Sequence, residues 1–220
     1  METGVIAVVT GDLVNSSSLG TDQTMMVMRQ LQEAFKSTEA GTLSGFEILR
    51  GDSFQGIVSV PANALIDALR IKTLVNSSIQ PAKAAANSSP LADVRISIGI
   101  GEATYDLNDI NISNGEAFQL SGKTLDEMKG NQQFTKISTP YPELNAEFLV
   151  YMKFLDYLTS RWSIASAEVV HYLLQGLKEQ EIADILKRSQ AAVNLRKKAA
   201  GWEEIKLLLD RYAYLITNKL

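Results

Sequence analysis

The segment 167–201 constrains the fold of this chain most strongly. Its sequence, AEVVHYLLQGLKEQEIADILKRSQAAVNLRKKAAG, contains three helical stretches, separated by a glycine and by the short turn KRS. Ile182, Ala183 and Leu186 have the spacing of residues that share one face of a helix. Val193 of the third stretch is expected to point into the same core, and the small Ala183 lets the helices cross closely. The pattern therefore predicts a helix-turn-helix over residues 167–201.

The third helical stretch is expected to present a polar outer face. That face carries Gln190, Ala191, Asn194, Lys197 and Lys198. Gln and Asn side chains can pair with adenine edges, cations suit phosphates, and the major groove of DNA admits one α-helix. Every charged residue between positions 186 and 201 is basic. These features predict DNA binding through Arg188, Gln190, Asn194, Arg196, Lys197 and Lys198. The alternative is a small helical domain with a solvated basic helix, since the same geometry occurs in domains that bind only proteins.

Composition bounds the class of protein. A length of 220 residues predicts one or two domains, and a hydrophobic content of 45% is enough for a sizeable core. The net charge of -4 argues against a surface coated in basic residues, so any contact with nucleic acid is confined to a local patch. The absence of Cys excludes disulfides and fits a reducing cytoplasm. The single histidine, His171, is expected to be a half-buried packing residue within a helix.

No membrane-bound or targeting segment is expected. The apolar run at residues 5–9 is too short for a membrane span, and no basic cluster precedes it. This run predicts a buried central strand, and the chain as a whole is expected to be cytoplasmic.

Residues 1–140 mix strand and helix patterns. Strands are expected over residues 5–12, 45–50, 54–60, 94–101 and 134–138, with helices over residues 22–36, after Pro61 and from Gly115. The helix over 22–36 has an expected inner row of Met25, Met28, Leu31 and Phe35. The order β-α-β-β-α-β, followed by a helix and a strand, predicts an α+β fold. We expect a ferredoxin-like antiparallel sheet with helices on one face.

Two aspartates are expected to converge at one edge of this sheet. In a ferredoxin-like topology the first and third strands are antiparallel neighbours, so the end of the first strand lies beside the hairpin turn. Asp12 and Asp52 would then meet. Two converging carboxylates suit a hard cation such as Mg²⁺ and the metal chemistry of phosphoryl transfer. The alternative is structural, because Asp is common in turns and at strand ends.

Pro140 and Pro142 mark a predicted boundary between the α+β domain (1–140) and an all-α domain (141–220) that contains the helix-turn-helix. Ser163 is placed to cap the first helix of that motif. The final segment, residues 202–220, has apolar residues at helical spacing. This segment is either a closing helix that packs on the motif or the seam of a homodimer, which would give the motif palindromic specificity.

Four motifs in the first 140 residues carry a resemblance: VVTGDLVNS, LRGDSFQG, VRISIGIGEA and GEAFQLSGK. They resemble segments of the class III nucleotide cyclase and diguanylate cyclase (GGDEF) catalytic domains. The resemblance implies that Asp12 and Asp52 are metal ligands, and that Gln119 and Lys123 are nucleotide-binding positions. Cyclases carry a transition-state Asn and Arg at the last two positions, and Ser53 replaces the second acid of the GGDEF signature. Because Lys lacks the planar fork of Arg, positioning of a triphosphate is weakened, which implies a degenerate domain.

The same motifs, followed by Arg161-Trp162 and the helix-turn-helix, cover nearly the full length and resemble the bacterial SatD-like family. The sequence thus predicts a DNA-binding transcriptional regulator whose cyclase-like domain senses or dimerises. DNA and a nucleotide effector are the expected partners, and Mg²⁺ is the candidate cofactor. The alternatives are a divergent metal-dependent nucleotidyl cyclase or nucleotide hydrolase, and a pair of protein-interaction modules.

Overall fold

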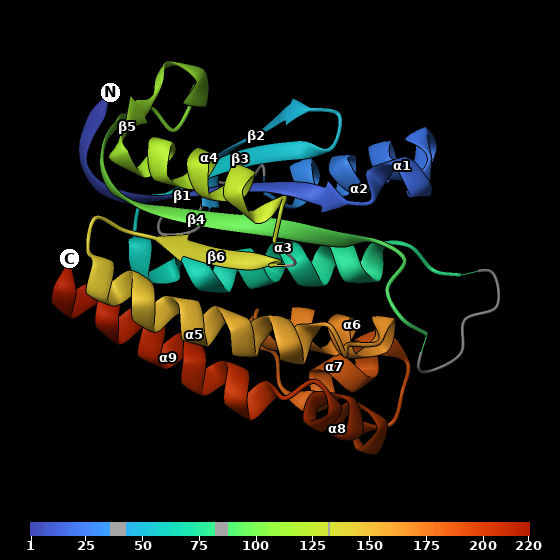
Figure 1. Cartoon of the computed structure of the whole chain (residues 1–220). Coiled ribbons are helices and arrows are strands. Elements are labelled where there is room, and N and C mark those ends of the chain that lie inside the picture. Colours follow the sequence, from blue (N-terminus) through green and yellow to red (C-terminus); the bar gives the residue numbers. More distant parts are fainter. Residues whose placement is uncertain (36–42, 82–87, 132) are drawn as a thin grey trace.

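A computed structural model of the chain describes residues 1–35, 43–81, 88–131 and 133–220 (Figure 1). Its centre is a six-stranded sheet in the order β2-β3-β1-β4-β5, with β6 paired to β4. The pairs are antiparallel except β4 with β6, which is parallel. The strands are β1 (Glu2–Val14), β2 (Leu43–Arg50), β3 (Ser53–Val58), β4 (Asp93–Tyr105), β5 (Asn114–Gly115) and β6 (Thr135–Ser138).

Helices flank the sheet and form the whole of the C-terminal part. Those that precede β6 are α1 (Ser16–Leu19), α2 (Thr21–Ala34), α3 (Ala64–Ser78) and α4 (Glu116–Met128), with short 3₁₀ turns η1 (Pro61–Asn63) and η2 (Ile110–Ile112). Those that follow are α5 (Pro142–Thr159), α6 (Ile164–Leu173), α7 (Glu179–Leu186), α8 (Gln190–Ala199) and α9 (Trp202–Lys219). The predicted α+β class is therefore confirmed at the level of an antiparallel sheet with helices.

The central strand β1 is buried on both faces because successive side chains of a strand point in opposite directions. Ala7 packs in the core that includes α3, whereas Val8 packs with Ala117 of α4. Figure 1 shows α3 and α4 on opposite faces of the sheet. Helices α2 and α3 share the first of these cores, so the expectation of helices on one face fails only for α4 among the helices that pack on the described sheet before β6. The physical reason is Gly99 of β4, where a side chain would collide with the backbone of Ala117 and Ser121, so α4 can lie directly on the strand.

The hydrophobic core crosses the predicted domain boundary at residue 140. One cluster of buried side chains contains residues of β1 and α3 together with residues of α5 and α9. The buried hydroxyl of Tyr212 in α9 donates to the Pro61 carbonyl at 2.8 Å, and Arg70 of α3 donates to the Leu174 carbonyl at 3.2 Å. His171 is half-buried against α3, as expected, with Nδ1 3.3 Å from the Thr73 hydroxyl. The two predicted domains thus pack as one body in the described part of the chain.

Helices α6, α7 and α8 pack around a small core of their own, formed by Val169, Ile182, Ala183 and Val193. Ser163 caps α6 by accepting the Ser166 N–H, as predicted, and Ser189 caps α8 by accepting the Ala192 N–H. Between α7 and α8 the chain reverses at Lys187, which has a left-handed backbone conformation (φ 51°). These features hold α8 in a fixed orientation with one side toward solvent.

Candidate functional site

The sheet brings Asp12 and Asp52 together, as the predicted topology requires; we call these two residues the carboxylate pair. Asp12 lies opposite Ser53 in the register of β1 with β3, and the Leu13 N–H donates to the Asp52 carbonyl at 2.9 Å. The Asp52 carboxylate accepts the hydroxyl proton of Ser16 at 2.7 Å. The end of β1 therefore lies beside the hairpin turn.

A cation already neutralises Asp12. Nη1 of Arg95, from the neighbouring strand β4, donates to both carboxylate oxygens of Asp12, at 3.0 and 3.2 Å. Burial raises the pKa of the Asp12 carboxyl, and the nearby Asp52 adds to the effect, while the charges of Arg95 and Lys129 oppose it. Sequence reasoning assigned Arg95 no role. This role depends on the register of β4 on β1, which places Arg95 directly opposite Asp12 and is not readable from local sequence patterns.

The carboxylate pair does not fit Mg²⁺ in this arrangement. Mg²⁺ requires several oxygen ligands in near-octahedral geometry, but both oxygens of Asp12 are engaged by Arg95. Among the described residues, no three His, Cys, Asp or Glu side chains form a group that could hold a metal ion. A metal bound by Asp12 and Asp52 therefore stays a prediction without structural support.

A pocket of about 470 Å³ adjoins Asp52 at the start of α2. Much of its lining consists of hydroxyl side chains: Ser16, Ser17, Thr21 and Thr24. No side chain caps α2, whose N-cap residue is Gly20. The first N–H groups of a helix lack intrahelical partners and carry a partial positive charge, which favours a polar or anionic group in such a setting.

Gln119 and Lys123, the predicted nucleotide-binding residues, lie on the exposed side of α4. The residues of α4 that face the sheet include Ala117 and Ser121, both fully buried. A separation of two residues turns a helix by about 200°, so Gln119 and Lys123 point away from the sheet. The structure therefore does not bring them toward the carboxylate pair. Ser121 of α4 contacts β1 directly, since its hydroxyl donates to the Thr10 hydroxyl at 2.6 Å.

The predicted DNA-binding residues fall into two groups. Arg188, Gln190 and Lys198 are exposed, and Asn194, Arg196 and Lys197 are half-buried. Nδ2 of Asn194 and Nζ of Lys197 donate to the Glu179 carboxylate of α7, at 3.2 and 3.3 Å. Lys197 also pairs with Glu203 at 2.9 Å. Hydrogen bonds to Glu203 and Glu179 raise the pKa of Lys197, so these two acids, which lie outside the basic window of the sequence, partly neutralise the helix.

The turn between α7 and α8 is basic and open; we call residues 187–190, which include the first residue of α8, the basic turn. All four of its residues are exposed, and within the described ranges no ion pair engages Lys187 or Arg188. Sequence reasoning did not include Lys187 among the DNA contacts. It also missed Leu195, which is 68% exposed in the middle of the outer face of α8. Helical spacing in the sequence indicated the exposure of Leu195, since this residue lies four positions after the exposed Ala191.

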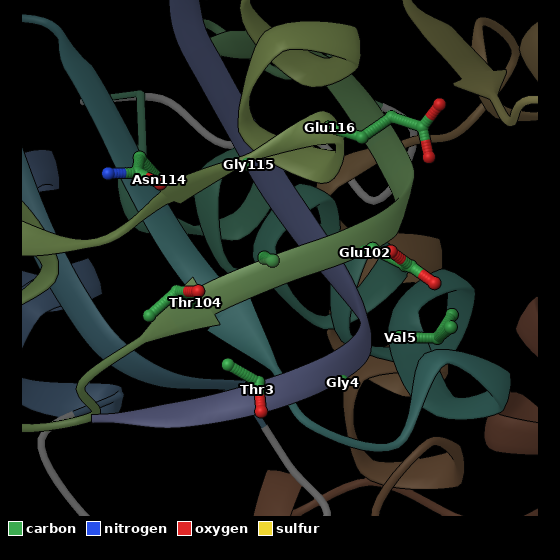
Figure 2. Close-up of a pocket in the computed structure, with 9 residues that line it drawn as sticks. Thr3, Gly4, Val5, Glu102, Thr104, Asn114, Gly115 and Glu116 are labelled. Carbon is green, nitrogen blue, oxygen red and sulfur yellow. The ribbon is translucent and has the colours of Figure 1, made fainter.

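A second pocket, of about 700 Å³, lies at the other end of β1 and was not singled out from the sequence (Figure 2). It is lined by Thr3, Gly4, Val5, Glu102, Ala103, Thr104, Asn114, Gly115 and Glu116. Glu102 and Glu116 are exposed, and Figure 2 shows both side chains on the same side of the pocket. The pocket lies at the opposite end of β1 from Asp12, so it is separate from the carboxylate pair.

No protein-family model matches this chain, and no curated protein matches it. The resemblances to the cyclase-type domains and to the SatD-like family accordingly rest on the sequence motifs. Among the described residues, no helix is both long enough and apolar enough to cross a membrane.

Proposed function

We propose that the chain is a DNA-binding regulator in which α7, the basic turn and α8 act as a helix-turn-helix. The exposure of the basic turn, on a helix anchored by the buried Val193, carries this proposal. In helix-turn-helix proteins the N-terminal residues of the second helix contact base edges in the major groove. Gln190 and Ala191 at the N-terminal end of α8 are exposed, with Lys187 and Arg188 beside them.

The exposed residues suggest a division of roles on DNA. Lys187, Arg188 and Lys198 would contact phosphates, which supply most of the affinity. Gln190 would contact a base edge, because a Gln amide can form two hydrogen bonds with adenine. Leu195, although apolar, suits the methyl group of thymine.

Glu179 opposes DNA binding in this scheme. Its carboxylate accepts hydrogen bonds from Asn194 and Lys197, both of which the sequence assigned to DNA. A carboxylate beside a phosphate is repulsive. We propose that Asn194 and Lys197 contribute to DNA binding only after their hydrogen bonds to Glu179 break and they contact the duplex instead.

The sheet would serve as the sensory part. The strand order β4-β1-β3-β2 agrees with a ferredoxin-like arrangement of β-α-β-β-α-β elements. Occupation of Asp12 by Arg95 agrees with a domain that has lost its metal chemistry. We propose that the pocket beside Asp52 receives the ribose hydroxyls of a nucleotide effector, because the Asp52 carboxylate accepts hydrogen bonds from hydroxyls and would repel a phosphate. Gln119 and Lys123, on the exposed side of α4, do not line this pocket.

Selection from a random pool of duplexes at low salt tests this function. The full chain should enrich a defined sequence, and Gln190→Ala should relax the preference at one position while binding to unselected duplex is kept. Lys219→Ala, an exposed cation at the end of α9, is the matched control and should leave the preference unchanged. Failure of the full chain to retain any duplex at low salt would refute DNA binding.

A second candidate function, a divergent nucleotidyl cyclase or nucleotide hydrolase, is favoured by one observation. The pocket that adjoins Asp52 has room for the phosphates of a nucleotide. Incubation with nucleoside triphosphates and Mg²⁺ or Mn²⁺ distinguishes it from the regulator. Turnover that disappears in Asp52→Ala but persists in Asp22→Ala, an exposed acid of α2, would establish an enzyme. The ion pair between Asp12 and Arg95 predicts no turnover.

A further inference from the structure

Exposed apolar side chains form a surface on α5 and α9, which we call the α5–α9 face. It comprises Val150, Phe154 and Tyr157 of α5 with Leu207 and Tyr214 of α9. Each of these five side chains is more than half exposed. Single exposed apolar residues are common on soluble proteins, but a contiguous group of large ones marks an interaction site.

Contacts between the two helices make this surface continuous. Figure 1 shows α5 and α9 side by side. Arg211 of α9 pairs with Glu147 in the first half of α5 at 3.2 Å, whereas Leu158, near the end of α5, packs by Gly201 before α9 begins. The two helices therefore run antiparallel. With Glu147 opposite Arg211, Leu207 falls opposite position 151, about one helical turn along α5 from Phe154.

Opposite charges lie at the two ends of the same stripe of α5. Glu143 in the first turn and Arg161 just after the last turn are both exposed. Positions 143, 150, 154, 157 and 161 follow at spacings of seven, four, three and four, so they lie on one side of the helix. The Arg161 guanidinium lies over the Tyr157 ring, 4.1 Å from its centroid. Along α5 the stripe therefore runs from an acidic residue, through three apolar residues, to a basic residue.

Such a stripe is complementary to itself when it is turned end for end. In an antiparallel pair of α5 helices centred on position 152, Glu143 of one copy lies opposite Arg161 of the other. The same centre places Val150 of one copy opposite Phe154 of the other. A two-fold interface presents one patch to its own copy, which requires this kind of self-complementarity. We propose that the α5–α9 face is the interface of a homodimer, with α5 packed antiparallel on α5 of a second copy.

Dimerisation through this face does not depend on DNA binding. The α5–α9 face and the basic turn share no residue, so variants of one surface leave the residues of the other unchanged. A dimer would carry two copies of α8 related by a two-fold axis, which matches the symmetry of a palindromic site.

Sedimentation velocity of the full chain over a range of concentrations tests the interface. The wild type should sediment as a dimer at high concentration, and Phe154→Glu should weaken the dimer by about tenfold or more, as expected at the centre of an interface. Ile112→Glu is the matched control, because Ile112 is about half exposed on η2 and lies outside the face. A wild type that stays monomeric at every concentration would overturn the proposal and leave the face to a different partner.

Charge reversal tests the antiparallel geometry. Glu143→Arg and Arg161→Glu should each weaken the homodimer, because each places like charges together at both ends of the paired helices. A mixture of the two variants should form a heterodimer, in which both contacts are again between opposite charges. Dimers that neither variant weakens, or a mixture that shows no gain over the separate variants, would contradict the pairing of α5 with α5.

Discussion

The carboxylate pair and the basic turn each collect like charges at the end of a secondary-structure element, but they differ in how those charges are balanced. Asp12 is neutralised by Arg95, and both side chains are largely buried. Lys187 and Arg188 face solvent, with no ion pair among the described residues. A charge that is satisfied internally stabilises the fold, whereas one that is left open is available to a ligand of opposite sign.

The comparison also holds within α8. Lys197 belongs to the same basic run as Lys198, but Glu179 and Glu203 engage Lys197 only. The number of cations in a segment therefore overstates its capacity to bind phosphate. Position relative to the acids of α7 and α9 decides which cations can act.

The largest expected effect concerns the carboxylate pair. Arg95→Ala should lower the free energy of unfolding by about 3 kcal/mol, because it leaves the buried charge of Asp12 without a partner. Chemical denaturation measures the change. Lys129→Ala, which removes an exposed cation that also acts on Asp12, should cost about 0.5 kcal/mol or less. If both variants are equally stable, Asp12 is solvated and free to bind a cation.

The next effect concerns the basic turn. Lys187→Ala with Arg188→Ala should weaken DNA binding by about tenfold or more at low salt, because two phosphate contacts are lost. Fluorescence anisotropy at several salt concentrations should show the slope of log affinity against log salt reduced by about 1.8. Lys206→Ala with Lys219→Ala removes two exposed cations of α9 and serves as the control. An equal loss in both double variants would mean that only net charge matters.

A smaller effect in the opposite direction is expected at Glu179. Glu179→Gln should strengthen DNA binding by about threefold, since it removes a negative charge and releases Lys197 and Asn194. The same anisotropy titration measures the gain. Glu168→Gln neutralises an acid of α6 that is bonded to Gln80 and should leave the affinity unchanged. Weaker binding in Glu179→Gln would show that Glu179 orients α8 for DNA.

The smallest effect concerns another carboxylate, the half-buried Asp156 of α5, which accepts hydrogen bonds from backbone N–H groups. One oxygen accepts from Phe134 at 2.9 Å, and the other has no hydrogen-bond partner among the described residues. Burial raises the pKa of Asp156, so the folded state binds this proton more tightly than the unfolded state. Stability should therefore fall as the pH rises from about 4 through the raised pKa.

Asp156→Asn removes this titration and should flatten that part of the stability curve. Denaturation at several pH values measures it. Asp126→Asn, an exposed acid of α4, is the control. A wild-type curve that rises over the same interval would show that Asp156 is stabilised as a charge.

Local patterns in the sequence predicted most elements of the structure. The pattern EQEIADIL predicted residues 179–186, where the structure has α7, because its apolar spacing and its flanking turns agree. The meeting of Asp12 with Asp52 followed from topology alone. By contrast, Met25 was placed in the core but is 44% exposed, whereas Val27 is buried. In a short amphipathic helix, a rotation about the helix axis by the angle between successive residues changes which side chains face the core.

The missed features depend on how elements pack. Hydrophobic periodicity does not say which face of a sheet a helix covers. The position of α4 could not be predicted from it, because α4 approaches β4 at Gly99, where a side chain would collide with the helix backbone. The pairing of Arg95 with Asp12 required the register of β4 on β1. The contacts from Glu179 to Asn194 required the crossing of α7 with α8. Each of these features joins residues that are distant in sequence or lie on different elements.

The most direct test of the central claim is an NMR titration of the full chain with a short DNA duplex at low salt. The account predicts that amide shifts concentrate on the basic turn and the first half of α8, from Lys187 to Asn194, and that they diminish as salt is added. Shifts that are absent, or that fall on the sheet while the basic turn is unaffected, would contradict it.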